Sequence, residues 1–217
     1  MSPDIRAVAF DFGGPVLVTP FERVRWLEGH LQLPKMRLDW RGPFDPHGDP
    51  LWQELQARHI SERDYWHRRA EEVAAHTGGS TPRELFGAIY SGPAEHYVRP
   101  EAMAFLDAAH DQGLATAIFT NDLRDFQGEE WARGIPFIQR VDVIVDGSIT
   151  GVLKPDPLSY ELLVAALDRR PAEILYIDDQ PFNVEAGRDA GLVAVWFDVT
   201  KPEESYRRAR DIINRGA

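Results

Sequence analysis

Polar side chains follow four apolar segments of the chain, near the point where each segment ends. Asp11 ends the first, Thr120-Asn121 the second and Asp178-Asp179 the fourth, and Lys154 lies in the loop after the third. Each residue alone is typical of a cap or a loop. Together they supply carboxylates, a hydroxyl, an amide and an ammonium group. Neighbouring carboxylates raise one another's pKa unless cations offset their charge, so the set favours a site that holds a cation and an anionic substrate.

The types of side chain indicate which cation this site would take. Carboxylate oxygens are hard ligands that favour Mg²⁺ over zinc, and Mg²⁺ usually keeps coordination positions for water and a substrate phosphate. The chain contains no cysteine, which excludes a thiolate zinc site, a disulfide and a catalytic thiol. With Lys154 as a second source of positive charge, the residues predict a Mg²⁺-dependent phosphate site.

Apolar runs bounded by polar residues predict the strands that would position these groups. We expect strands at residues 5–10, 114–119, 141–145, 173–177 and 192–197. Helical spacing predicts helices at residues 101–112, 157–169, 184–190 and 202–215. This alternation predicts an α/β fold with a parallel sheet covered by helices on both faces. In such sheets ligands bind beyond the carboxyl ends of the strands, where the polar residues would meet.

The segment between the first strand and the later alternation has a different pattern. We expect helices at residues 21–33, 50–59, 61–76 and 81–90 and no strand among them. Ser61 and Thr81 are expected N-caps, each with an acidic residue three positions later. The first strand belongs to the same sheet as the later ones, so this segment is an insertion. We predict a core of residues 1–17 and 98–217 and a helical cap of residues 18–97.

Four ordered segments resemble the motifs of the haloacid dehalogenase superfamily. They are residues 10–17 (Phe-Asp-Phe-Gly-Gly-Pro-Val-Leu), 119–121 (Phe-Thr-Asn), 151–157 (Gly-Val-Leu-Lys-Pro-Asp-Pro) and 176–179 (Tyr-Ile-Asp-Asp), the last followed by Asn183. The helical insertion resembles the type-1 cap of that superfamily, so the resemblance covers nearly the whole chain. It implies a Rossmann-like, doubly wound parallel sheet with an inserted all-helical cap that sets substrate specificity.

The resemblance implies a role for each residue of the first two motifs. Asp11 would be the carboxylate nucleophile, which forms an aspartyl-phosphate in the phosphatase members, and it would also bind Mg²⁺. Gly13 would offer its backbone carbonyl to the metal. Thr120 and Asn121 would hold the phosphoryl oxygens.

The later motifs carry further implied roles. Lys154 would bridge the nucleophile and the phosphoryl group. Asp179 would be a direct metal ligand, and Asp178 a second or water-mediated one. Asn183 would orient Lys154 or the groups around the metal. A carboxylate that attacks phosphorus needs both negative charges screened, which a metal ion and a lysine would do.

Gly13 departs from the pattern of the superfamily, whose phosphatases mostly carry an aspartate acid–base at this position. General acid–base catalysis contributes about 10²–10⁴ in rate. Three interpretations remain open. Another group substitutes, such as Asp122, or Asp45 or His47 in the loop that also carries Arg41, or water alone. Alternatively, the substrate has a good leaving group, as in an anomeric or acyl phosphate. In the third, the protein is a poor catalyst or only binds its ligand.

The sequence therefore predicts a Mg²⁺-dependent phosphatase of a small phosphorylated metabolite, such as a sugar phosphate. The alternative by family is a metal-independent 2-haloacid dehalogenase with the same nucleophile, although such enzymes typically lack the paired acids Asp178-Asp179. A weakly active or non-catalytic ligand-binding protein is the third hypothesis.

Composition limits the partners that we expect. Hydrophobic residues make up 43% and charged residues 27% of the 217, typical of a globular protein. The formal net charge of −11 argues against a nucleic-acid partner. No apolar run approaches the roughly 18 residues of a membrane span, and the first residues lack a signal-peptide pattern. We expect a cytoplasmic protein without nucleic-acid or membrane partners, and leave its oligomeric state open.

Overall fold

The computed structural model describes residues 4–79 and 81–215. The chain divides into two compact units, one of Met1–Val18 with Pro93–Ala217 and the other of Thr19–Gly92. We call them the sheet unit and the helical unit. The sequence-based boundaries lie at residues 17/18 and 97/98, and the assignment of the helical unit as a specificity cap stays a prediction.

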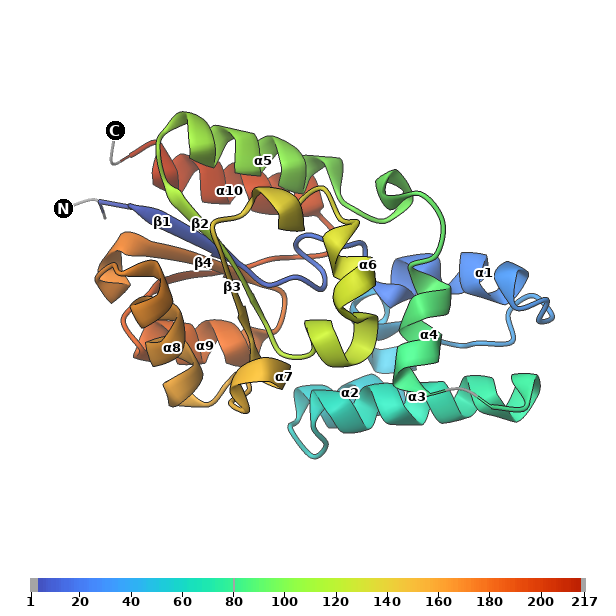
Figure 1. Ribbon diagram of the computed structural model, residues 1–217. Coiled ribbons are helices and arrows are strands. Elements are labelled where there is room, and N and C mark those ends of the chain that lie inside the picture. The colour runs from blue at the N-terminus through green and yellow to red at the C-terminus, as the bar shows by residue number, and fades with distance from the viewer. Residues whose placement is uncertain (1–3, 80, 216–217) are drawn as a thin grey trace. The chain divides into compact units, whose positions relative to one another are not determined.

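The sheet unit contains one five-stranded parallel sheet in the order β3-β2-β1-β4-β5. Its strands are β1 (Ala7–Phe10), β2 (Ala115–Thr120), β3 (Val143–Asp146), β4 (Ile174–Asp178) and β5 (Val193–Trp196). The sheet is covered on one face by α5 (Pro100–Asp111) and α10 (Pro202–Ile213), and on the other by α8 (Pro157–Leu167) and α9 (Pro181–Asp189) (Figure 1). The predicted Rossmann-like α/β fold is confirmed.

Successive residues of the strands point to opposite faces, and both faces are apolar. On the side of α8 and α9, Ala7, Ala9 and Ala117 pack in one buried cluster with the rings of Tyr160 and Tyr176. Alanine is small, so it leaves room for these rings above the sheet. On the opposite face, Phe10 packs edge-on against Phe105 and Phe137. Burial of both faces explains why the strands are almost continuously hydrophobic.

Short elements complete the sheet unit. They are η3 (Ala94–His96), the π-helical turn η4 (Leu123–Gln127), α6 (Glu129–Arg133), η5 (Ile138–Arg140), α7 (Gly147–Thr150) and η6 (Pro171–Glu173). None of them is predicted from the sequence. Helix α9 begins three residues before its predicted start, because the proline at its first position favours the start of a helix. Helix α8 ends two residues before its predicted end, because Asp168 takes a left-handed conformation (φ 52°) that ends the helix.

The described residues of the helical unit form helices and loops only. The helices are α1 (Pro20–His30), η1 (Gly42–Phe44), η2 (Pro46–Gly48), α2 (Pro50–Gln56), α3 (Glu62–Thr77) and α4 (Pro82–Ile89). The predicted N-caps Ser61 and Thr81 both form capping boxes. Aromatic rings build the interior, where Trp66 contacts Phe21, Tyr65 and Phe86.

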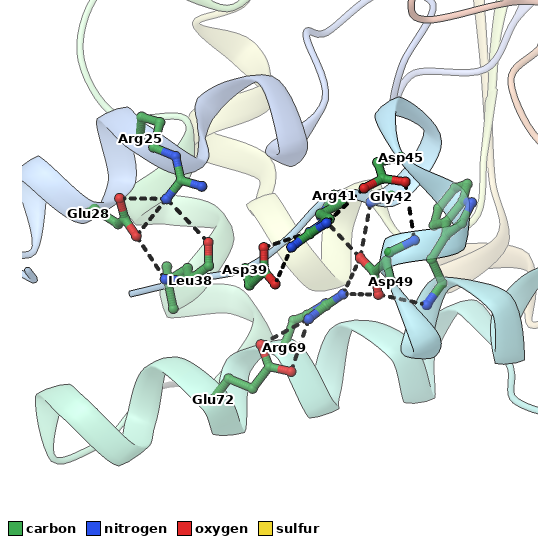
Figure 2. A network of polar contacts seen from close by, with 12 residues as sticks. Arg25, Glu28, Leu38, Asp39, Arg41, Gly42, Asp45, Asp49, Arg69 and Glu72 are labelled. Carbon is green, nitrogen blue, oxygen red and sulfur yellow. Dashed lines mark hydrogen bonds and ion pairs between the residues drawn. The ribbon is translucent and has the colours of Figure 1, made fainter. Parts of the chain in front are cut away.

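A loop between α1 and α2 is held by two buried carboxylates (Figure 2). Glu28 accepts hydrogen bonds from the backbone N–H groups of Leu38 at 2.7 Å and Met36 at 3.1 Å. Asp49 accepts from the backbone of Gly42 at 3.0 Å and pairs with the buried guanidinium of Arg69 at 2.6 Å. The conformation of this loop therefore depends on backbone hydrogen bonds to two carboxylates and on one buried ion pair, all within the helical unit.

The length and polarity of the helices decide whether any of them could span a membrane. Every helix among the described residues is too short or too polar to traverse a bilayer.

Candidate active site

The three predicted carboxylates come together at the carboxyl edge of the sheet. Asp11 follows β1, and its backbone N–H donates to Ile177 O at 2.8 Å, which extends the pairing of β1 with β4. Asp178 and Asp179 lie at the end of the adjacent strand β4. One carboxylate oxygen from each of the three lies within 4.8 Å of the others. The expected clustering is thus present in the structure.

Lys154 lies between two of these carboxylates. Its ammonium group donates to Asp11 Oδ1 at 2.7 Å, Asp178 Oδ2 at 2.8 Å and the carbonyl oxygen of Phe119 at 2.9 Å. These bonds use all three N–H donors of the group. The rings of Phe119 and Tyr176 lie 5.1 and 5.7 Å from the nitrogen. Burial by itself lowers the pKa of Lys154, but the charges of Asp11 and Asp178 outweigh it and raise that pKa.

The protonation of Asp11 depends on what lies beside it. Burial raises the pKa of Asp11 from 3.8 to about 7, a shift that the Lys154 ammonium opposes and the Asp178 charge reinforces. An attacking carboxylate must be ionised, and a cation beside it favours the ionised form. A cation bound beside Asp11 would therefore favour its ionised form.

Asp178 is fully buried and its carboxylate is surrounded by donors. It accepts hydrogen bonds from Lys154, the Tyr176 hydroxyl, the Gln180 backbone N–H at 2.7 Å and the Asn183 amide at 3.2 and 3.3 Å. Two carboxylate oxygens offer about four acceptor positions, so protein donors already occupy most of them. Asn183 contacts Asp178 rather than Lys154. The expected part of Asp178 in metal binding stays a prediction.

Gly14 lies directly against Asp179, the third carboxylate of the cluster. Its φ of +93° is one that side-chain residues rarely adopt, and a Cβ atom there would lie 2.8 Å from Asp179 Cγ. On the other side, the Gln180 side-chain amide donates to Asp179 Oδ2 at 3.3 Å. No role for Gly14 is predicted from the sequence, although the Gly-Gly-Pro run soon after Asp11 indicates a turn that needs glycine.

The loop of residues 11–17 is held from distant parts of the chain. Arg99, which is 3% exposed, donates through Nε to Gly14 O at 2.6 Å. The Tyr206 hydroxyl of α10 donates to Pro15 O at 2.8 Å. Neither residue is predicted from the sequence, because their partners lie 85 and 191 positions away and leave no local pattern.

The two polar residues of the second motif, Thr120 and Asn121, have different contacts. Thr120 ends β2, and its hydroxyl has no hydrogen-bond partner among the residues that the structure describes. The Asn121 amide donates to Lys154 O at 3.1 Å and accepts from Lys154 N at 2.7 Å. Asn121 therefore positions the backbone of Lys154. Phosphoryl binding by Thr120, Asn121 and Lys154 stays a prediction.

Gly13 leaves its surroundings open. It is exposed, its φ lies outside the left-handed region, and a Cβ atom there would meet only Asp11 Oδ2 at 3.8 Å. The glycine is therefore not required by the backbone or by packing. No fourth histidine, aspartate or glutamate joins the cluster of three among residues 4–79 and 81–215.

Three residues could substitute for the acid that is missing at Gly13, namely Asp122, Asp45 and His47. Asp122 is buried, and its carbonyl accepts from Phe126 N at 2.9 Å at the start of η4. Asp45 pairs with Arg41 at 2.8 Å and bonds the Gly48 backbone N–H at 3.2 Å, all within the helical unit. His47 is exposed in the same loop. Acid–base action by any of them stays a prediction.

The donor set fits a hard divalent cation. The three carboxylates are accompanied by one ammonium group, so negative charge remains to be offset. Oxygen ligands at one sheet edge suit Mg²⁺. The absence of a side chain at Gly14 also keeps the space beside Asp179 free of a clashing atom.

The chain is similar in sequence to proteins that are named as phosphatases. A phosphoserine phosphatase from Thermus thermophilus is 29% identical over 158 residues, which cover 69% of this chain and 63% of that protein. A validoxylamine A 7'-phosphate phosphatase from Streptomyces hygroscopicus subsp. limoneus is 25% identical over 81% of this chain and 83% of that protein. The chain thus spans less than two thirds of the first relative's length and most of the second's.

The fold also matches solved structures. A putative HAD-hydrolase from Bacillus subtilis, solved bound to magnesium, is similar with a TM-score of 0.73 at 16% identity, over 97% of this chain and 99% of that one. At that identity the likeness concerns the fold alone. The model of the haloacid dehalogenase-like hydrolases matches residues 5–191. With its sheet, its four motif segments and this match, the chain belongs to the haloacid dehalogenase-like hydrolase family.

Proposed function

We propose that the protein is a Mg²⁺-dependent phosphatase that hydrolyses a phosphate monoester of a small metabolite through an aspartyl-phosphate on Asp11. The observation that carries the proposal is the group of three carboxylates within 4.8 Å, two of them joined by the buried ammonium of Lys154. The two curated relatives described above, both named as phosphatases, support the same reaction class.

The metal would be held by Asp11, the Gly13 carbonyl and Asp179, with Asp178 as a second or water-mediated ligand. Bound Mg²⁺ would supply charge neutralisation and polarise a phosphoryl oxygen. Lys154 offsets negative charge on the opposite side, because its ammonium donates to Asp11 Oδ1. This bond leaves Asp11 Oδ2, the oxygen nearest to Gly13, as the nucleophilic atom.

The reaction would proceed in two displacements. Asp11 Oδ2 attacks phosphorus, the bond from phosphorus to the leaving oxygen breaks, and that oxygen takes a proton from solvent or from an acid. Water then attacks phosphorus, which releases inorganic phosphate and a proton and restores the Asp11 carboxylate. The Thr120 hydroxyl would hold a phosphoryl oxygen in both steps.

A dehalogenase would use the Asp11 nucleophile without a metal, and the position of Asp179 beside Asp11 would then have no chemical purpose. The test is turnover of acyl, aryl, anomeric sugar and alkyl phosphates, with Mg²⁺ or with a chelator, by wild type and Asp11→Asn. Asp107→Asn, at an exposed position of α5, is the matched control. We expect Mg²⁺-dependent phosphate release by wild type and the control only.

The same assay separates the alternatives. Halide release from a 2-haloacid without metal would identify a dehalogenase. Ligand binding without turnover of either substrate class would identify a non-catalytic protein. Wild-type activity in Asp11→Asn would refute the covalent mechanism.

A further inference from the structure

The ring of Trp196 is exposed, but its indole N–H group is hydrogen-bonded to the protein. It ends β5, an edge strand of the sheet, and its side chain is 45% exposed. Its indole Nε1–H donates to the backbone carbonyl of Asp179 at 2.9 Å. An exposed indole can donate to water, so this bond to a carboxylate-bearing residue calls for a specific explanation.

The bond from Trp196 belongs to a pair. The register of β4 and β5 places Trp196 opposite Asp178, and the next backbone N–H, that of Phe197, donates to Asp178 O at 2.8 Å. Trp196 at the end of β5 and Phe197 directly after it thus hold the carbonyls of Asp179 and Asp178. These carbonyls belong to the two peptide planes that flank the Asp179 Cα atom. Fixing both planes sets the direction in which the Asp179 side chain leaves the backbone.

The Asp179 carboxylate has little freedom at its other end. It lies against Gly14, where even a Cβ atom would come within 2.8 Å of Cγ. Directly after it the chain turns from β4 into α9 at Pro181. A backbone shift that reoriented the Cα–Cβ bond of Asp179 would therefore move the carboxylate away from Asp11 or into Gly14.

We propose that Trp196 is a positioning residue that holds Asp179 ready to bind the metal ion. The proposal rests on the Mg²⁺ site of the proposed function and adds a residue outside its motifs. Trp196→Phe keeps a smaller aromatic ring and removes the donor. Loss of one hydrogen bond corresponds to about a two- to tenfold change in an equilibrium constant, so we expect Mg²⁺ to bind about two- to tenfold more weakly.

The experiment is calorimetric titration of Mg²⁺ into the full chain, wild type and variants, with urea unfolding of each protein. Trp26→Phe is the matched control, because Trp26 is 37% exposed and its ring stacks on His30 within the helical unit. We expect weaker Mg²⁺ binding in Trp196→Phe at an unchanged urea midpoint, and wild-type values in Trp26→Phe. A Mg²⁺-dependent change in tryptophan fluorescence should persist in Trp26→Phe and be lost or reduced in Trp196→Phe.

Trp196→Leu, which removes the ring as well, separates positioning from packing. Equal weakening of Mg²⁺ binding in the Phe and Leu variants supports the proposal. Wild-type Mg²⁺ affinity in Trp196→Phe, or weakening only where the urea midpoint also falls, overturns it and leaves the proposed function intact. If wild type itself binds no Mg²⁺, the metal site of the proposed function is wrong, and this inference fails with it.

Discussion

Gly14 and Asp179 are in such close contact that a side chain at position 14 would displace the Asp179 carboxylate. A Cβ atom there would lie 2.8 Å from the Asp179 carboxylate carbon, and the φ of +93° is unfavourable for any residue with a side chain. The neighbouring glycine, Gly13, has ordinary φ and open space around it. Two adjacent glycines therefore differ in why they are there, which makes them a matched pair for mutation.

We expect Gly14→Ala to weaken Mg²⁺ binding and lower kcat/KM at least tenfold, because Asp179 must move from its place. The left-handed φ should also cost about 1 kcal/mol in the free energy of unfolding. Gly13→Ala should keep both stability and Mg²⁺ affinity close to wild type. Calorimetry, kinetics and urea unfolding of the two variants check this. Equal effects at both positions would show that the contact with Asp179 is irrelevant.

The open space at Gly13 allows the missing acid to be restored. Because wild type lacks this acid, its rate should depend steeply on the leaving group. Aryl, acyl and anomeric phosphates should be hydrolysed much faster than alkyl phosphates. Gly13→Asp should raise the rate on alkyl phosphates by up to the roughly 10²–10⁴ that general acid catalysis contributes. Gly13→Ala is the control, since it adds a side chain without the acid.

A flat dependence on leaving group in wild type would contradict this expectation and indicate a substitute acid. Asp122→Asn, Asp45→Asn and His47→Gln, assayed in turn on an alkyl phosphate, would then identify it. The variant that restores a steep dependence carries the acid.

The raised pKa of Asp11 predicts how stability depends on pH in metal-free protein. In the folded state the pKa is about 7, and the ordinary value is 3.8. Between these pH values Asp11 is ionised in the unfolded chain but still protonated in the folded one. The free energy of unfolding therefore falls as pH rises through this range. Asp11→Asn lacks this penalty. Its stability relative to wild type should therefore grow from about pH 4 to pH 7 and level off above.

Urea midpoints in chelator at several pH values measure this difference. Added Mg²⁺ should stabilise wild type and not Asp11→Asn, because ligand binding to the folded state adds to stability. A difference between the two proteins that stays constant or shrinks from pH 4 to pH 7 would contradict the burial of Asp11 as the cause.

The helical unit contains a pair of adjacent arginines with opposite environments. Arg69 is buried against the buried carboxylate of Asp49, whereas Arg68 forms an exposed pair with Glu54. Arg69→Met should lower the free energy of unfolding by about 3–5 kcal/mol, because it leaves the buried Asp49 carboxylate without its cation. Arg68→Met should change it by about 1 kcal/mol or less. Urea unfolding of both variants is the measurement, and similar losses would argue against a buried ion pair.

The sequence by itself determined which chemistry-bearing residues meet. Apolar runs identified the strands, and parallel strands bring their carboxyl ends to one edge, so Asp11, Lys154 and the acid pair Asp178-Asp179 could be predicted to cluster. The alternation of strands and helices also determined the fold class. These features follow from local hydrophobic patterning, which a single sequence displays.

Only the tertiary structure decided how these residues are held. Asn121 bonds the Lys154 backbone and Asn183 bonds Asp178, choices that depend on which buried donor lies nearest to which acceptor. Arg99 and Trp196 reach their partners Gly14 and Asp179 across 85 and 17 positions. Such contacts satisfy polar groups that folding buries, and their partners are set by how the elements pack rather than by any local pattern in the chain.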